Sequence, residues 1–91
     1  MTQALVIVNH QVNDYATWRT GYENVQPLRD QHGVTAANVL QDPADPNKVT
    51  VLHWFPSVGQ AEAFVGAPEL QEAMKKAGVA APPRIEVMVE A

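Results

Sequence analysis

The sequence predicts an α+β fold in which one antiparallel sheet carries its helices on one face. Three observations lead to this prediction. Segments rich in β-branched and apolar residues recur along the chain, as strands require. Stretches with large apolar residues at helical spacing lie between them. The two halves also share a pattern, because His10 and His53 each lie four residues before a predicted helix cap, Asp14 and Ser57.

The first strand is predicted over Ala4 to Val12. Its first five residues form a continuous apolar run, which is typical of a central strand covered on both faces. Asp14 follows as a good helix N-cap, because its carboxylate can accept hydrogen bonds from the free amides of the first turn.

The first helix should extend from this cap to about His32. Its buried stripe is predicted from helical spacing and consists of Trp18, Tyr22, Val25 and Leu28. Pro27 predicts a kink or break, because proline lacks an amide donor and crowds the preceding turn. Gly33 is the expected C-terminal cap, and His32 is expected to be a cation at the helix end without a further role.

A hairpin should follow, with a weaker strand over Val34 to Gln41 and a stronger one over Lys48 to Phe55. The connecting loop consists of turn-forming residues. Its polar side chains could suggest calcium ligation, but the loop lacks the glycine and distal glutamate of a calcium loop. Asx turns explain these residues, which are Asp42, Asp45 and Asn47.

The second helical region should begin at Ser57 and break near Gly66, where Pro68 suits the first turn of a second segment. That segment should close at Gly78. After a proline-containing linker, the residues from Arg84 to Glu90 alternate between apolar and other residues as a last strand. The order β-α-β-β-α-β is the split βαβ pattern of ferredoxin-like folds.

Strand alternation assigns the side chains of the central strands to two faces. One face carries Ala4, Val6, Val8 and His10, together with Val49, Val51, His53 and Phe55. The other carries Leu5, Ile7, Asn9 and Gln11, together with Thr50, Leu52 and Trp54. With helices on one side only, this second face needs a cover. A partner sheet is the simplest one, so we expect a homodimer with Trp54 in its interior.

Composition limits the function classes. We expect one domain over residues 1–91. The net charge of −4 argues against a nucleic-acid partner, and the absence of cysteine excludes disulfides and thiolate metal sites. No apolar run approaches the roughly 18 residues of a membrane span, and the N-terminal residues lack a basic region. We therefore expect a cytoplasmic protein without a membrane partner.

Four parts of the sequence form a familiar set, namely Asn9 to Tyr15 with Trp18, Asp42 to Asn47, Glu69 to Met74, and Ala77 to Val79. Together they resemble the dimeric α+β barrel superfamily, and more narrowly the small bacterial proteins grouped with the antibiotic biosynthesis monooxygenases. The superfamily includes cofactor-free monooxygenases acting on polycyclic aromatics, haem-degrading enzymes, lactone isomerases, polyketide cyclases and members without a known reaction. The resemblance implies a pocket inside each subunit, between sheet and helices.

The haem-degrading members carry an asparagine, a tryptophan and a histidine at places that correspond here to His10, Phe64 and Met74. Asn9 lies next to the first of these places. The axial histidine is therefore missing, and haem degradation is not expected. No cofactor is expected, and Phe64 and Met74 are candidate substrate contacts through this correspondence.

His10 and His53 are the candidate catalytic residues. We expect the first and third strands to be parallel neighbours, which would bring both histidines together at their carboxyl ends, inside the pocket with Trp18 and Tyr22. A histidine titrates near neutral pH and could exchange a proton with a phenol or enol. The alternative is a pair of half-buried histidines bonded to backbone or water. A metal site would need a third ligand, and none is evident.

Trp18 and Tyr22 could stack on a flat substrate, although a pair at this spacing is also typical of a core. Asn9 and Asn38 could flank the pocket or bond water, and the sequence does not decide. The remaining cations are expected on solvated faces, namely Arg19, Arg29, Lys75 and Lys76. Two functions remain open. One is a cofactor-independent oxygenase, isomerase or cyclase on an aromatic or enolisable compound, and the other is a non-catalytic barrel that binds a small apolar ligand.

Overall fold

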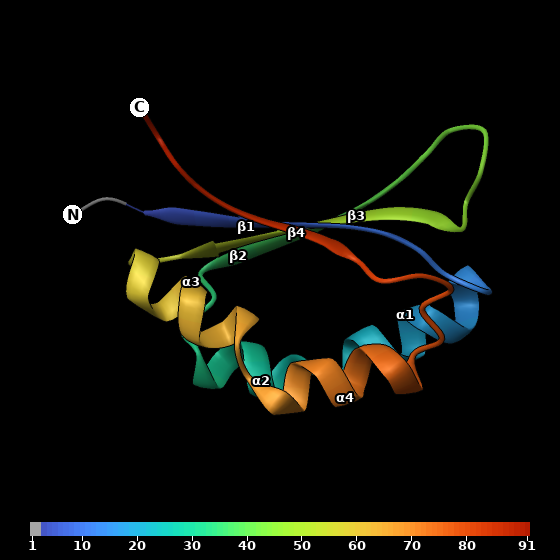
Figure 1. Ribbon diagram of the computed structural model, residues 1–91, viewed down its shortest axis with the longest axis horizontal. Helices are drawn as coiled ribbons and strands as arrows, with labels where there is room; N and C mark the ends of the chain where they lie inside the picture. The colour runs from blue at the N-terminus through green and yellow to red at the C-terminus, as the bar shows by residue number, and fades with distance from the viewer. Residues whose placement is uncertain (1–2) are drawn as a thin grey trace.

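The computed structural model describes residues 3–91 and contains four strands and four short helices. The elements in chain order are β1 (Ala4–Gln11), α1 (Tyr15–Asn24), α2 (Gln26–Gln31), β2 (Ala36–Gln41), β3 (Lys48–Phe55), α3 (Val58–Val65), α4 (Pro68–Lys76) and β4 (Arg84–Val89). The sheet order is β2-β3-β1-β4, with every neighbouring pair antiparallel. All four helices lie on one face of the sheet (Figure 1). The predicted ferredoxin-like fold is confirmed.

Both helical regions begin at the predicted caps and divide near their prolines. The side chains of Asp14 and Ser57 accept hydrogen bonds from the amides of Thr17 and Gln60, at 3.0 and 3.2 Å. Pro27 lies in the first turn of α2 and Pro68 in the first turn of α4. Because the first turn leaves its amides unpaired in any case, a proline there costs no helical hydrogen bond. The sequence therefore starts new helices at these points.

Gly33 and Gly78 end the two helical regions in the same way. Their φ angles are +79° and +82°, in the left-handed region that glycine adopts without strain. This matches the predicted glycine caps and turns the chain back toward the sheet.

The core lies between the helices and the predicted face of β1 and β3. Exposure alternates along both strands, and the residues on the helix side are buried. The largest fully enclosed side chains are Phe55, Phe64, Val6, Val12, Val49 and Val51. The assignment of faces from strand alternation is therefore confirmed.

The expectation that the first and third strands are parallel was wrong, whereas the predicted antiparallel sheet is confirmed. β1 and β3 are antiparallel, with Val6 opposite His53 and His10 opposite Val49. The physical reason is the connectivity. A hairpin reverses β3 relative to β2, and β3 then lies between β1 and β2, antiparallel to both.

The sheet face away from the helices is apolar and only partly shielded. Leu5, Ile7, Leu52 and Trp54 are half-buried there, and no described helix or strand covers them (Figure 1). Leu40 and Met88 on the same face are 49% and 46% exposed. Among residues 3–91, no helix has both the length and the apolar character needed to cross a membrane.

Candidate functional site

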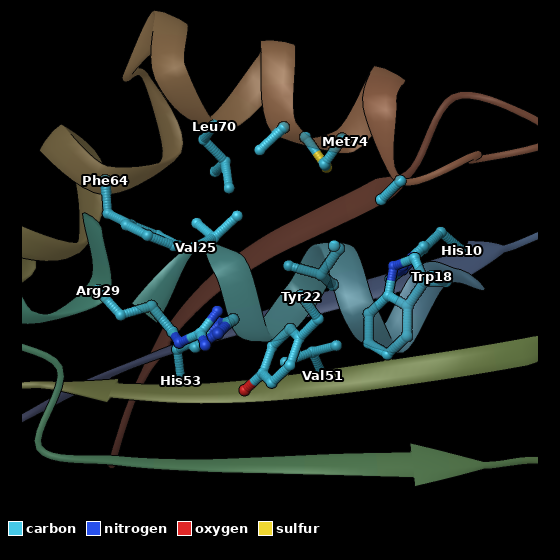
Figure 2. A pocket seen from close by; sticks show the side chains of 14 residues that line it. His10, Trp18, Tyr22, Val25, Arg29, Val51, His53, Phe64, Leu70 and Met74 are labelled. Atoms are coloured by element: carbon cyan, nitrogen blue, oxygen red, sulfur yellow. The ribbon is translucent and has the colours of Figure 1, made fainter. Parts of the chain in front are cut away.

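A small apolar pocket lies between the sheet and the helices (Figure 2). Its volume is about 50 Å³, room for about three or four water molecules. All six side chains chosen from the sequence line it, and they are His10, Trp18, Tyr22, His53, Phe64 and Met74. The structure thus brings residues from β1, α1, β3, α3 and α4 to one place.

The two histidines lie at opposite ends of this pocket, which corrects the prediction that they are close neighbours. In the antiparallel register, their positions are four residues apart along the strands, a distance of about 13 Å. Trp18 and Tyr22 lie between them, with ring centroids 5.1 Å apart. Trp18 lies 5.4 Å from the ring of His10, and Tyr22 lies 6.2 Å from that of His53.

Both imidazoles are enclosed without hydrogen-bond partners. His10 is 8% exposed and His53 is 4% exposed. None of their four ring nitrogens makes a hydrogen bond to the described residues. Buried polar groups without a partner are uncommon in proteins. Of the alternative, half-buried histidines bonded to backbone or water, the backbone bonds are absent among the described residues.

Burial keeps both imidazoles neutral. It lowers the pKa of His10, although the backbone of Val8 acts in the opposite direction without reaching hydrogen-bond geometry. Burial, together with the positive charge of Arg29, lowers the pKa of His53 to about 4. Each neutral ring carries one proton acceptor and one N–H donor.

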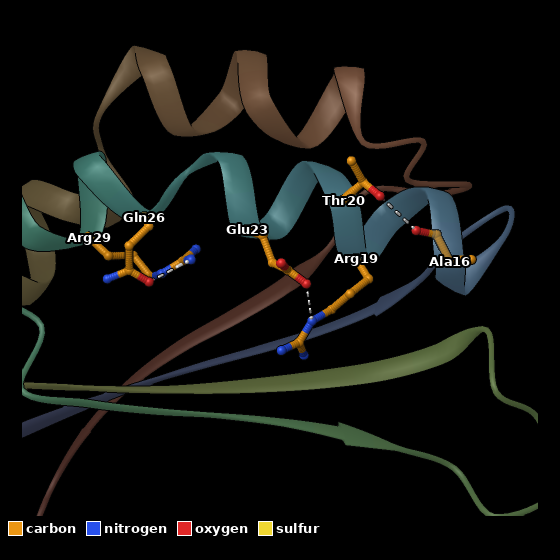
Figure 3. A network of polar contacts seen from close by, with 6 residues as sticks. All are labelled: Ala16, Arg19, Thr20, Glu23, Gln26 and Arg29. Carbon is orange, nitrogen blue, oxygen red and sulfur yellow. Dashed lines mark hydrogen bonds and ion pairs between the residues drawn. The ribbon is translucent and has the colours of Figure 1, made fainter.

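Arg29 is the pocket residue that sequence reasoning missed. It was expected on a solvated face, but it is 3% exposed and lines the pocket from α2. Its guanidinium carbon lies 3.9 Å from the ring centroid of Tyr22, and its Nη2 donates to Gln26 Oε1 at 3.1 Å (Figure 3). Arg29 lies seven residues after Tyr22, which is two helical turns, so spacing could have indicated it.

Arg19 has the surface role that both arginines were expected to have. Its Nε lies 3.1 Å from Glu23 Oε1, and both side chains are well exposed (Figure 3). Lys75 and Lys76 are also exposed.

The other polar candidates lie away from the pocket. The side chain of Asn9 accepts a hydrogen bond from Thr50 Oγ1 at 2.6 Å on the sheet face opposite the helices. Asn38 lies on that same face and is exposed. His32 ends α2 and packs edge-on against Phe64, with ring centroids 5.7 Å apart.

The loop after β2 forms Asx turns, as predicted. Asp42 Oδ1 accepts from the amide of Ala44 at 2.8 Å, and Asp45 Oδ1 accepts from the amide of Asn47 at 3.0 Å. Across residues 3–91, no three histidine, aspartate or glutamate side chains come together as a metal site would require.

A wider groove of about 840 Å³ runs outside the pocket between α1 and α4. Gly21, Val25 and Ala73 border both spaces. The groove and the pocket are therefore neighbours across this helix pair.

Several solved structures share the fold of this protein. No protein-family model and no curated protein sequence matches the chain. A candidate antibiotic biosynthesis monooxygenase from Bordetella bronchiseptica is 18% identical with a TM-score of 0.83, covering 100% of this chain and 99% of that one. The chain thus has the fold of the antibiotic biosynthesis monooxygenases.

Two further neighbours have a stated activity. SnoaB, a cofactor-independent oxygenase from Streptomyces nogalater, is 9% identical with a TM-score of 0.74, covering 100% of this chain and 93% of that one. The monooxygenase ActVA-Orf6 of Streptomyces coelicolor, in complex with nanaomycin D, is 21% identical with a TM-score of 0.73. The match covers 99% of this chain and 88% of that one. At these identities the likeness establishes a shared fold.

Proposed function

We propose that the protein is a cofactor-independent monooxygenase that acts on a small aromatic or enolisable substrate, with a pocket histidine as proton acceptor. One observation carries this proposal. Two neutral imidazoles, whose nitrogens make no hydrogen bond to the described residues, line a small apolar pocket together with aromatic rings. Perturbed, buried titratable groups that line a cavity are candidates for acid–base chemistry.

The proton step follows from the state of these histidines. A neutral imidazole accepts a proton from a carbon acid such as an aromatic ketone, and an enolate results. The enolate supplies electrons to dioxygen. With anthrone as substrate, one O₂ is consumed, two C–H bonds are lost at the methylene carbon, and anthraquinone and water are formed. Trp18 and Tyr22 would pack against the planar rings.

The neighbours with the same fold support an oxygenase over other reactions, because SnoaB and ActVA-Orf6 are both oxygenases. An isomerase or cyclase on an enolisable substrate would use the same proton transfer. The shared step is therefore the part of the proposal to test first.

We also propose a homodimer formed through the open sheet face, in the cytoplasm. The partly exposed apolar side chains on that face support the dimer. A sheet with helices on one face leaves its other face exposed to water. A second sheet could cover that face.

The second candidate function is a non-catalytic barrel that binds a small apolar ligand. The small volume of the pocket favours it, because few substrates fit without movement of the helices. Ligand binding without oxygen uptake would identify this function.

Oxygen uptake with anthrone tests the proposal. We expect turnover by the wild type and a loss of about 100-fold or more when His10→Phe and His53→Phe are combined, because proton transfer by a positioned group contributes on the order of 10²–10⁴ in rate. Phenylalanine keeps a ring in place and removes both nitrogens. His32→Phe is the matched control, since His32 does not line the pocket, and it should retain activity. Unchanged turnover in the double variant would contradict the proposal.

A further inference from the structure

Arg29 is a buried cation without a counter-ion among the described residues. The ion pairs within residues 3–91 are Arg19–Glu23 and Arg84–Glu86, and neither includes it. Its one side-chain hydrogen bond is to the neutral amide oxygen of Gln26. Charged groups are rarely buried unless they are paired, because desolvation is costly.

The guanidinium has unused donors. Nε and Nη1 make no hydrogen bond to the described residues and are not among the fully enclosed nitrogens. Asp30, the adjacent carboxylate in sequence, is exposed and accepts a hydrogen bond from Gln26 Nε2 at 2.8 Å. Burial lowers the pKa of Arg29, yet guanidinium stays protonated in proteins. A positive charge therefore persists beside the pocket.

No second charged side chain lines the pocket beside Arg29 among the described residues. The other residues that line the pocket are apolar or aromatic, apart from the two neutral histidines, and none of them carries a carboxylate. The site thus combines one cation, the N–H donor of His53 and an apolar, aromatic wall.

We propose that the pocket binds a small aromatic oxyanion, with the guanidinium of Arg29 as its counter-ion and His53 as a second hydrogen-bond donor. The planar fork of arginine matches the two oxygens of a carboxylate, and the apolar wall suits an aromatic body. This inference rests on the proposed function of the pocket as a substrate site and adds the charge of the ligand.

A purely structural role would also account for Arg29, because its guanidinium stacks on Tyr22. The two roles differ in ligand selectivity. A structural arginine stabilises the fold but does not distinguish an anionic ligand from a neutral one of the same shape.

Isothermal titration with benzoate and benzamide separates these roles. The two probes share size and shape and differ in charge, and benzoate is the smallest aromatic carboxylate. At pH 7.5 the wild type should bind benzoate at least tenfold more tightly than benzamide. Arg29→Gln should abolish this preference and leave benzamide affinity within about threefold. Arg19→Gln is the matched control, because Arg19 lies 5.3 Å from the same Tyr22 ring but is exposed, and it should keep the preference.

Three results would overturn the inference: equal affinities in the wild type, a preserved preference in Arg29→Gln, or no binding of either probe. The wild-type comparison alone decides the matter if Arg29→Gln does not fold. Turnover of anthrone, which is neutral, is measured separately. Equal affinities with intact turnover would refute the anion site and leave the oxygenase proposal standing. Selective benzoate binding without turnover would refute the oxygenase proposal and leave the anion site standing.

Discussion

At the residue scale, the chemistry of the pocket depends on which protonation states its walls permit. His53 lies where burial and the charge of Arg29 both oppose a second positive charge. The guanidinium of Arg29 has no ion-pair partner among the described residues that line the pocket. Each group is costly to enclose, and a ligand that bonds to both would relieve that cost.

The pH dependence of stability provides a test at this scale. The folded-state pKa of His53 is about 4 and its ordinary value is 6.5, so the unfolded chain binds this proton first as pH falls. The stability contribution is fully present above about pH 6.5 and is lost as pH falls toward 4. The difference between the two pKa values corresponds to about 3 kcal/mol of unfolding free energy.

Urea unfolding at pH 7 and pH 4.5 measures this effect. The wild type should lose more stability between these pH values than His53→Phe, which has no proton to bind at that position. Equal losses in the two proteins would show that His53 does not resist protonation in the fold.

Strand alternation and helical spacing indicated four of the six pocket side chains, namely His10, His53, Trp18 and Tyr22. The family resemblance supplied the other two, Phe64 and Met74. Sequence reasoning missed Arg29, because a charged residue near a helix end is usually solvated. The position of Arg29 two turns after Tyr22 indicated a shared face, but burial of a guanidinium follows only from the three-dimensional packing of α2.

At the element scale, the contact between α1 and α4 closes the pocket. Gly21 faces Ala77 so closely that a Cβ added at Gly21 would lie 2.8 Å from the Cβ of Ala77. The helices can meet here only without a side chain at position 21. Residues of this joint also border the outer groove.

Gly21→Ala should force the two helices apart. Overpacking of this kind costs about 1–3 kcal/mol. Gly59→Ala is the matched control in α3, where the added methyl group meets only Ser57 Oγ at 3.9 Å, and it should stabilise by about 0.5–1 kcal/mol through helix propensity. Thermal unfolding of both variants measures the difference. A Gly21→Ala protein as stable as Gly59→Ala would show that the helices do not touch here.

The order and ends of the elements could be predicted because caps, prolines and glycines act locally. Asp14, Ser57, Gly33 and Gly78 each mark an end through their own backbone or side chain. Strand direction was the error, because it depends on how three separate segments connect across the sheet. The separation of the two histidines follows from that direction.

At the scale of the whole molecule, the sheet has one covered face and one open face. Trp54 lies half-buried on the open face, among the apolar side chains of β1 and β3. A dimer would bury this face against its copy, which is a common use of such a surface.

Trp54→Lys should break the proposed dimer, because it places a charge in an apolar interface. Light scattering should report twice the chain mass of 9.9 kDa for the wild type and 9.9 kDa for the variant. Val58→Lys, at a 38% exposed apolar position on α3, is the control and should remain dimeric. A wild type of 9.9 kDa at micromolar concentration would refute the dimer.

The central claim is that a neutral pocket histidine accepts a proton from a carbon acid. Deuterium exchange at the methylene carbon of anthrone, followed by NMR in D₂O without oxygen, tests it most directly, because proton removal is then separated from oxidation. We predict exchange well above the buffer rate with the wild type and with His32→Phe, and exchange at the buffer rate with the His10→Phe, His53→Phe double variant. Exchange by the double variant at the wild-type rate, or a wild type no faster than buffer, would contradict the claim.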